Sequence, residues 1–542
     1  MSTSPRTNVS RREVFLPTSE RDHLTPAGTG RARHDDDEIG RDDGGLATIR
    51  ATVGAAHAGV YLGAGSLGPA WAGTEQAVLV LGPPRSGKTS SIVVPTVLGA
   101  PGAVVSTSTK PDVLRATAPA RGTVGPCLLY DPSGTVDTPR GVQRVRWSPV
   151  ESCRTWDDAL LVARSLVGAA RPGTGARDTA APGGGDHWTE RAESLLAPTL
   201  HAAALDGADL ATVLSWVDRR NAATALGILD RNAATRPGDL LAGIAATDPR
   251  EQSGIWSTAS GVLAAYRSEA ALATTVAPDF DAGAFCDSSA TLYICATGRH
   301  QSVTAPLVVG LLTDIRTAAY ARSASGVQGA ATPGDRPPPV VLALDEVANI
   351  APIPDLPGMV SEGAGQGLLT LACLQDLSQA RGRWGSAADG FLSLFGTTVV
   401  LPGIGDVRTL EALSALAGEQ EVRTRAVSAP VQGPGGMGAV LSRLVLGPRS
   451  QRGEQTPTVT TSTVMRRRLP VDVVARGETG MALVVDERNS MGWVRLTPWF
   501  ATEPWRSVAL GPERGLERAP RAGPVLSARA PGTGRDGGLG GP

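Results

Sequence analysis

One stretch of the sequence decides the fold: Ala77-Val78-Leu79-Val80-Leu81-Gly82-Pro83-Pro84-Arg85-Ser86-Gly87-Lys88-Thr89-Ser90. Its apolar start suits a buried strand, its middle fits G-x-x-x-x-G-K-[ST], and a helix-compatible stretch begins near Thr89. In this order of strand, loop and helix the motif binds phosphate, because the loop amides and the helix N-terminus face the phosphate oxygens. We expect residues 82–90 to bind ATP, with Lys88 on the β- and γ-phosphates and the Thr89 hydroxyl on Mg²⁺.

Lysine is almost absent from the chain: Lys88 and Lys110 are its two lysines among 51 basic residues. A compact ammonium fits a phosphate loop, whereas a planar guanidinium does not, so the retention of Lys88 supports the phosphate site. Lys110 follows the apolar run 102–107, and the carboxyl end of a parallel strand faces the ligand crevice. It could contact the nucleotide, an adjacent subunit or a translocated strand, or be a plain surface lysine.

A second motif supplies two carboxylates. Residues 340–346 read Val-Val-Leu-Ala-Leu-Asp-Glu, a buried strand that ends in two acids. Asp345 is expected to hold the magnesium, directly or through water, and Glu346 to orient and polarise the attacking water. Gln375 ends the following apolar run, where its amide could sense the γ-phosphate. Four arginines near such strand ends are candidates for a finger that reaches a neighbouring subunit's nucleotide: Arg299, Arg381, Arg383 and Arg408.

Seven apolar runs of strand length predict a sheet: residues 76–81, 102–107, 127–130, 290–296, 340–344, 368–374 and 397–401. Their hydrophobicity is continuous rather than alternating, which is typical of parallel strands covered on both faces. From residue 155 to about residue 272 the apolar spacing is helical instead. Helices are expected there at residues 156–168, 187–205, 210–229 and 251–266. The predicted fold class is α/β, a mainly parallel central sheet with an inserted all-α domain.

These patterns divide the chain into domains and tails. A P-loop ATPase domain is expected at residues 46–152 and 276–505, interrupted by the all-helical domain at residues 153–275. Residues 1–45 and 506–542 have compositions that cannot bury enough apolar surface to fold, so both tails are expected to be disordered. Internal insertions are expected at residues 171–185, 323–339 and 428–463.

Bulk composition narrows the function. The 51 basic and 52 acidic residues give a net charge of −1, which excludes a globally basic nucleic-acid-binding chain but not a local basic channel. The five cysteines form no close pair, which argues against a disulfide scaffold or a zinc site and favours the cytoplasm. No run approaches the roughly 20 apolar residues of a bilayer span, so the chain is expected to be soluble.

The residues after each motif resemble those of a known family. Residues 345–354 read Asp-Glu-Val-Ala-Asn-Ile-Ala-Pro-Ile-Pro, and Ser-Glu-Gly-Ala-Gly-Gln-Gly at 361–367 and Leu-Gln-Asp-Leu-Ser-Gln at 374–379 continue the pattern. This block resembles the coupling proteins of type IV secretion and conjugation, the TraG/TraD family, and the resemblance extends over roughly residues 60–500. The turn at 108–112, Ser-Thr-Lys-Pro-Asp, keeps the family's lysine but lacks the acid before it.

The resemblance implies a RecA-like motor domain that binds ATP and Mg²⁺, with the helical domain facing the cytoplasm. Such motors form a homo-hexamer and deliver relaxase-bound single-stranded DNA, or protein substrates, to the components of a type IV secretion channel. Typical members carry N-terminal transmembrane helices, which this sequence lacks. A separate membrane anchor protein is therefore expected to hold the chain at the cytoplasmic face of the membrane.

Two other functions stay open at this point. The chain could be an ATP-switched receptor that recognises protein cargo without moving DNA, which a near-neutral surface suits. It could also be an FtsK/HerA-like DNA translocase, although the long helical block before residues 340–346 argues against that reading. The sequence does not identify the cargo, the trans-acting arginine or the DNA-contacting residues.

Overall fold

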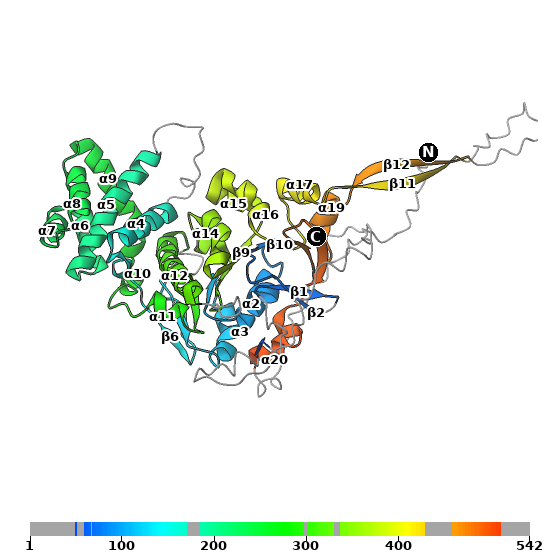
Figure 1. The fold of residues 1–542 in the computed structure, drawn as a ribbon, viewed down its shortest axis with the longest axis horizontal. Helices are drawn as coiled ribbons and strands as arrows, with labels where there is room; N and C mark the ends of the chain where they lie inside the picture. Colours follow the sequence, from blue (N-terminus) through cyan, green and yellow to red (C-terminus); the bar gives the residue numbers. More distant parts are fainter. Residues whose placement is uncertain are drawn as a thin grey trace, which may run out of the picture.

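The structure, a computed structural model, describes residues 49–50, 59–66, 68–170, 185–296, 301–329, 337–428 and 458–510. The predicted tail at residues 1–45 lies outside them, as does Arg299. In the described chain a large sheet lies between layers of helices, with a block of further helices at one end and a narrow two-stranded ribbon at the other (Figure 1).

The central sheet has twelve strands among the described residues, in the order β2-β1-β14-β13-β10-β3-β9-β8-β4-β7-β5-β6. From β10 to β6 every neighbouring pair is parallel, whereas β13, β14, β1 and β2 add an antiparallel edge. The strands are β1 (Tyr61–Gly65), β2 (Gly68–Trp71), β3 (Val78–Leu81), β4 (Val104–Ser108), β5 (Cys127–Tyr130), β6 (Val142–Arg144), β7 (Thr291–Cys295), β8 (Val340–Leu344), β9 (Leu368–Leu374), β10 (Thr397–Val400), β13 (Met481–Val485) and β14 (Met491–Arg495). The seven predicted apolar runs are β3, β4, β5, β7, β8, β9 and β10, so the predicted fold class is confirmed.

Helices cover both faces of this sheet, which explains the continuous hydrophobicity of its strands. Alternate side chains of β3 enter two different cores: Leu79 and Leu81 one, Val78 and Val80 the other. The first core also takes side chains from α12 (Gln301–Gly329), α13 (Val347–Ile350), α14 (Leu356–Gly363), α15 (Leu377–Trp384), α16 (Phe391–Leu394) and α17 (Val407–Leu416). The second takes them from η2 (Thr89–Val93), α2 (Val94–Gly99), α3 (Asp112–Arg121) and α20 (Trp505–Leu510).

Between β6 and β7 the regular elements of the described chain are all helical. They are η3 (Glu151–Cys153), α4 (Trp156–Ala170), α5 (Gly185–Asp206), α6 (Leu210–Asp218), α7 (Ala223–Arg231), α8 (Thr235–Ala245), α9 (Pro249–Val262), η4 (Leu263–Arg267), α10 (Glu269–Ala273) and α11 (Ala282–Cys286). The single helix predicted at residues 210–229 is wrong: it is two helices, because the chain turns at Arg220, where φ is +54°.

The helical block packs through α4 against α12, which covers the sheet, and the segment that leads into the block also contacts α12 closely. At Gly310 of α12 a Cβ atom would lie 2.6 Å from the indole of Trp147, so only glycine lets the ring approach. The Trp147 Nε1–H donates to Asp314 Oδ2 at 3.0 Å.

No helix in the described part of the chain combines the length and the apolar character that a membrane crossing needs.

The end of the described chain corrects one prediction. Residues 506–510 were expected to be disordered, but they belong to α20. The reason is Trp505, which is 2% exposed and whose ring centroid lies 4.9 Å from that of Tyr61 and 5.8 Å from that of Trp71. Packed aromatic pairs of this kind add about 0.5–1.5 kcal/mol each beyond the area that they bury, so they fix α20 to β1 and β2. Residues 511–542 lie outside the described chain.

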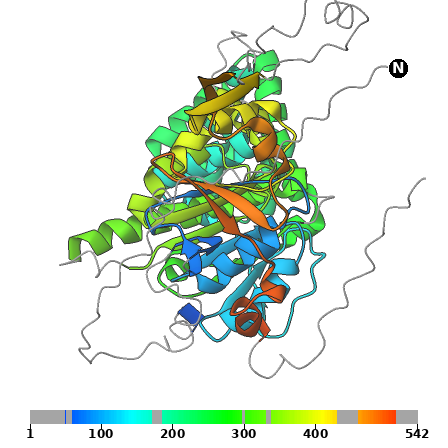
Figure 2. The same cartoon turned by 90° about the vertical axis from the view of Figure 1, so that its right-hand side faces the viewer.

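The ribbon consists of β11 (Glu419–Ser428) and β12 (Thr458–Arg467), which pair with each other in a sheet of their own. Figure 2 shows the molecule from the ribbon's side, with the ribbon lying above the sheet. It follows α17 and is followed by α19 (Val471–Arg476). Of the insertion predicted at residues 428–463, residue 428 belongs to β11 and residues 458–463 to β12, and the rest lies outside the described chain.

Candidate nucleotide site

The loop after β3 curls tightly back on itself. Arg85 and Gly87 have φ angles of +64° and +100°, in the region that favours glycine. The start of the loop is equally confined: a Cβ at Gly82 would lie 2.8 Å from Ser86 Oγ and 2.9 Å from Leu401 Cβ. A loop of this curvature turns its backbone N–H groups inward, which is how such loops bind anions.

Lys88 lies inside this curl. The residue is 7% exposed, and its Nζ donates to the carbonyl oxygens of Gly82 at 2.5 Å and Pro83 at 3.0 Å. The two carbonyls therefore occupy two of the ammonium's three donors, as phosphate oxygens would. Ser86 Oγ is buried close by without a hydrogen-bond partner among the described residues. A buried cation beside an unsatisfied hydroxyl fits a phosphate group.

The two motifs meet at Thr89 and Asp345. Thr89 Oγ1 donates to Asp345 Oδ2 at 2.6 Å, although the two residues are far apart in sequence. They meet because β9 pairs in parallel with both β3 and β8, so the carboxyl ends of the three strands lie side by side. Mg²⁺ is commonly held by one or two carboxylates together with substrate phosphates. A hydroxyl and a carboxylate in contact beside a phosphate loop fit that ion.

Asp345 is a buried carboxylate at the carboxyl end of β8. The residue is 5% exposed, and this burial raises the pKa of the carboxyl above its ordinary value, against the opposing effects of the Thr89 hydrogen bond and the Lys88 charge. Thr107 Oγ1, from β4, donates to the Asp345 backbone carbonyl at 3.2 Å and so fixes the end of β8. A desolvated carboxylate of this kind gains most when a cation binds it.

Glu346 adopts a strained backbone conformation. Its φ and ψ are +57° and +44°, a left-handed conformation that costs a residue with a Cβ about 1–2 kcal/mol. Strain of this kind clusters at functional sites, where the surrounding structure enforces it. Asn349 Nδ2 donates to Glu346 Oε2 at 2.8 Å. Asn349 was not among the predicted site residues, although its spacing of three residues from the acid was a usable signal.

Gln375 lies at the end of β9, between the strands that carry the two motifs. The Gly82 N–H donates to the Leu374 carbonyl at 3.1 Å, which brings the start of the phosphate loop next to Gln375. The Gln375 N–H donates to Gln379 Oε1 at 2.9 Å. Lys110 is exposed just beyond the end of β4, and its predicted contacts stay predictions.

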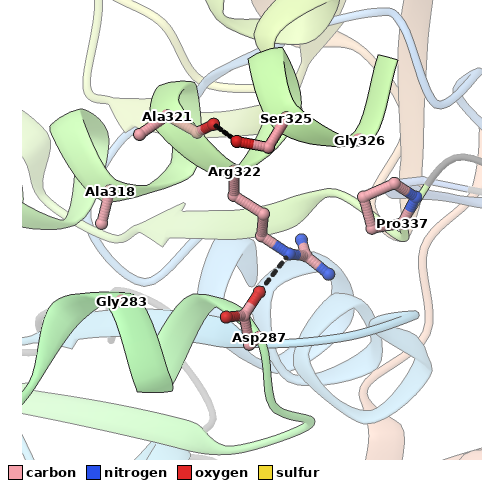
Figure 3. Close-up of a pocket in the computed structure, with 8 residues that line it drawn as sticks. All are labelled: Gly283, Asp287, Ala318, Ala321, Arg322, Ser325, Gly326 and Pro337. Carbon is pink, nitrogen blue, oxygen red and sulfur yellow. Dashed lines mark hydrogen bonds and ion pairs between the residues drawn. The ribbon is translucent and has the colours of Figure 1, made fainter. Parts of the chain in front are cut away.

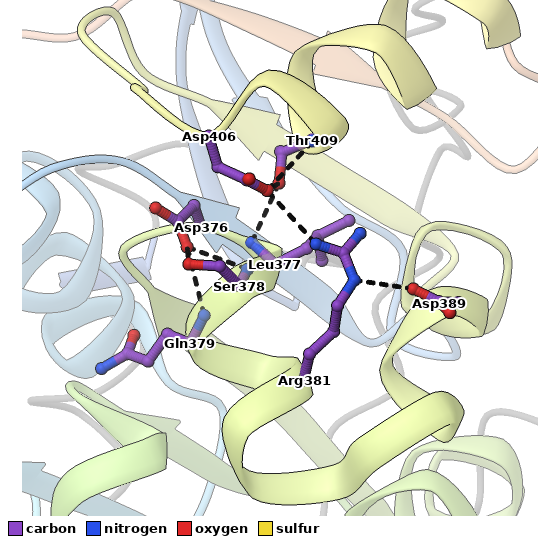
Figure 4. A network of polar contacts seen from close by, with 8 residues as sticks. All are labelled: Asp376, Leu377, Ser378, Gln379, Arg381, Asp389, Asp406 and Thr409. Atoms are coloured by element: carbon purple, nitrogen blue, oxygen red, sulfur yellow. Dashed lines mark hydrogen bonds and ion pairs between the residues drawn. The ribbon is translucent and has the colours of Figure 1, made fainter.

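One of the candidate finger arginines is held within its own chain. Figure 4 shows Arg381 between two acids: its Nε donates to Asp389 Oδ1 at 2.8 Å and its Nη1 to Asp406 Oδ2 at 3.3 Å. Partial burial acts to raise the pKa of Asp406, but hydrogen bonds from Thr409 and Arg381 outweigh this effect and lower the pKa below its ordinary value. Leu377 N–H donates to Thr409 Oγ1 at 3.1 Å, which ties α15 to α17. Arg408, by contrast, is exposed.

A pocket of about 650 Å³ lies elsewhere, between α11, α12 and the segment before β8 (Figure 3). Arg322 Nε donates there to Asp287 Oδ1 at 3.0 Å, and its Nη1 donates to the Pro338 carbonyl at 2.9 Å. Pro337 and Pro338 precede β8, so this pocket is at the amino edge of the strand whose carboxyl end carries Asp345. It includes none of the predicted site residues.

The fold and this site define a P-loop NTPase of RecA-like architecture, and solved structures with the same fold agree. The unbound monoclinic form of the bacterial conjugative coupling protein TrwBdeltaN70 matches with a TM-score of 0.56 at 18% identity, over 78% of this chain and 85% of that chain. TrwB in complex with ADP and Mg²⁺ matches with a TM-score of 0.55 at 18% identity, over 78% and 86%. TrwB with the non-hydrolysable ATP analogue ADPNP gives 0.54 at 17% identity, over 78% and 86%.

The sequence itself identifies the family. The family model described as type IV secretory system conjugative DNA transfer matches residues 38–435. The chain belongs to this family, as the resemblance of its motifs predicted. No curated protein sequence gives a significant match.

Proposed function

We propose that the chain is an ATP-hydrolysing coupling protein that recruits and drives relaxase-bound single-stranded DNA, or protein substrates, into a type IV secretion or conjugation channel. One observation carries the proposal: the 2.6 Å contact between Thr89 Oγ1 and Asp345 Oδ2 joins the two nucleotide motifs in a chain of the conjugative DNA transfer family. TrwB, which shares the fold, was solved with ADP and Mg²⁺ and with an ATP analogue, which supports the same ligands here.

Each residue of the site has a distinct part in this proposal. Lys88 and the amides of residues 82–90 hold the β- and γ-phosphates, and Thr89 and Asp345 hold Mg²⁺, which when bound neutralises charge on the phosphoryl oxygens. Asn349 engages Glu346 Oε2, and Glu346 Oε1 accepts a hydrogen bond from the attacking water. Gln375, beside the loop, senses whether the γ-phosphate is present.

The proposal extends to an assembly, which the family resemblance implies. In the proposed homo-hexamer the nucleotide lies between subunits, and a neighbour supplies an arginine. Residues 46–152 and 276–505 form the motor in this proposal, residues 153–275 form the cytoplasm-facing helical domain, and a separate membrane protein anchors the ring at the cytoplasmic face. Molecular mass measured with and without ATP tests the ring, and membrane fractionation with and without the secretion components tests the anchoring.

The enzymatic part is tested by ATPase rates with and without single-stranded DNA over a salt series. Stimulation should appear at low salt and collapse as salt rises, because phosphate contacts release counterions. Lys88→Ala should abolish nucleotide binding, and Glu346→Gln should bind ATP but stall hydrolysis. Unchanged turnover in Glu346→Gln would refute the assignment of the base. Absent DNA stimulation, together with tight binding of a relaxase or effector, would support the ATP-switched receptor instead.

A further inference from the structure

The β11–β12 ribbon is the part of the fold that the nucleotide site does not use. Its strands form ten pairs, from Glu419↔Arg467 at the base to Ser428↔Thr458. Ten residues of antiparallel strand extend about 34 Å, and the ribbon projects away from the sheet and its helices (Figure 1). A two-stranded hairpin alone is at best marginally stable in water, so a ribbon of this length indicates a binding partner.

Both faces of the ribbon are open near its base. Residues 462–467 of β12 are all exposed, and successive side chains of a strand point to opposite faces. Val464 is 43% and Met465 55% exposed. The base is attached to the body by Arg467, whose Nη1 donates to Ser414 Oγ of α17 at 3.4 Å. The ribbon is thus attached at its base, where residues 462–467 remain accessible.

Positive charge is concentrated in this region. The two strands of the ribbon contain four arginines, two glutamates and no aspartate, a formal charge of +2 in a chain whose net charge is −1. Arg423 pairs with Thr463, and Arg466 pairs with Gln420, so neither arginine has a carboxylate directly opposite. The partner that complements this surface is a polyanion.

Three observations favour double-stranded DNA as that polyanion. The major groove of B-DNA admits a two-stranded β-ribbon. Residues 419–468 contain no aromatic residue, whereas single-strand binding relies on rings that stack with bases. Hydroxyl side chains bind phosphate oxygens alongside arginine, and β12 carries five of them: Thr458, Thr460, Thr461, Ser462 and Thr463.

We propose that the β11–β12 ribbon is an arm that binds the phosphate backbone of double-stranded DNA without sequence preference. The inference rests on the proposed DNA-transfer function and assigns the duplex a binding surface away from the nucleotide site. The arm would hold the duplex beside the motor while the single strand is moved.

The experiment uses the full chain with the triple variant Arg423→Gln/Arg425→Gln/Arg466→Gln and a fluorescent duplex of random sequence. Duplex affinity at fixed salt should fall tenfold or more. The slope of log affinity against log salt should become shallower by about 0.9 for each phosphate that the arm no longer neutralises. The matched control, Arg219→Gln/Arg236→Gln/Arg250→Gln, removes the same charge from exposed positions of the helical block and should bind duplex like the wild type.

Four results would overturn the inference. The arm variant could keep wild-type duplex affinity and salt slope, or the control variant could lose as much duplex affinity as the arm variant. The arm variant could also lose as much affinity for single-stranded DNA as for duplex, or lose binding to polyglutamate while duplex binding stays intact. The last result would assign the arm to an acidic protein. Basal ATPase should be unchanged in both variants. Lys88→Ala should keep duplex affinity while losing nucleotide, so failure of the arm and failure of the proposed ATPase give different results.

Discussion

Replacement of Asp345 by asparagine tests the site most directly, because the change keeps the side chain's shape and removes its charge. The Thr89 hydroxyl can still donate to the amide oxygen, so the fold should be retained. The lost interaction is the one between a buried charged group and Mg²⁺, which we set at about 2 kcal/mol by analogy with hydrogen bonds to charged groups. That corresponds to about a 30-fold weaker affinity for MgATP.

The assay is thermal unfolding with MgATP and with ATP in EDTA. At a MgATP concentration of 100 times the wild-type Kd, the ligand stabilises the wild type by about 2.7 kcal/mol, and a 30-fold weaker variant by about 0.9 kcal/mol. Asp131→Asn is the matched control. Asp131 also follows a strand, has a fully buried side chain and accepts hydrogen bonds from Ser133, Val136 and Arg144. Its replacement should destabilise the protein by about 1–3 kcal/mol and leave the magnesium response intact.

The pH dependence of the ligand-free protein gives an independent check. Because burial raises the folded-state pKa of Asp345, the unfolded chain loses this proton at lower pH than the folded chain does. Wild-type stability relative to Asp345→Asn should therefore fall as pH rises from about 4 through the folded-state pKa, and then stay constant.

In the magnesium assay, a magnesium-dependent stabilisation of wild-type size in Asp345→Asn, or its loss in Asp131→Asn, would refute the assignment of Asp345 as the magnesium ligand.

Two further predictions concern packing. Gly82→Ala places a Cβ against Ser86 Oγ and Leu401 Cβ. We therefore expect thermal unfolding to show a loss of about 1–3 kcal/mol in the free energy of unfolding, and titration calorimetry to show weaker MgATP binding. Wild-type affinity would show that the loop accommodates the methyl group. Trp505→Ala removes an indole packed on Tyr61 and should lower the free energy of unfolding in urea by about 3–5 kcal/mol. Trp505→Phe should be closer to the wild type. Unchanged stability in Trp505→Ala would mean that α20 does not hold the edge of the sheet.

Buried strands were predictable because their physical requirement is local. A strand covered by helices on both faces needs an unbroken apolar run, and Val340–Leu344 of β8 shows one. The edge strands β1 and β2, with the sequences Tyr-Leu-Gly-Ala-Gly and Gly-Pro-Ala-Trp, show neither a run nor an alternation, since they are short and only partly covered. The ribbon gave no signal either, because its described side chains, residues 419–423 and 462–467, are not buried and so require no apolar periodicity.

The site likewise has residues that the sequence predicts and features that only the folded structure shows. The residue types at Lys88 and Asp345 were readable from motifs, because a phosphate loop and a strand-end acid are local features. The sequence could not show that Asp345 and Asp131 have different hydrogen-bond partners. Both follow apolar strands, and only the folded structure shows that turn amides and Arg144 donate to Asp131 whereas Asp345 accepts from Thr89 of the phosphate loop. The strain at Glu346 likewise depends on how β8 ends against its neighbours.

The position of β3 in the sheet has a consequence for synthesis of the chain. Its neighbours are β9 and β10, which leave the ribosome about 300 residues later, a delay of about 15–60 s at 5–20 residues per second. During that time Val78–Leu81 has two unpaired edges and four apolar side chains, while the helices between β6 and β7 fold through contacts close in sequence. A nascent chain that stops before residue 368 therefore carries a complete phosphate motif on a strand that has neither of its two neighbours.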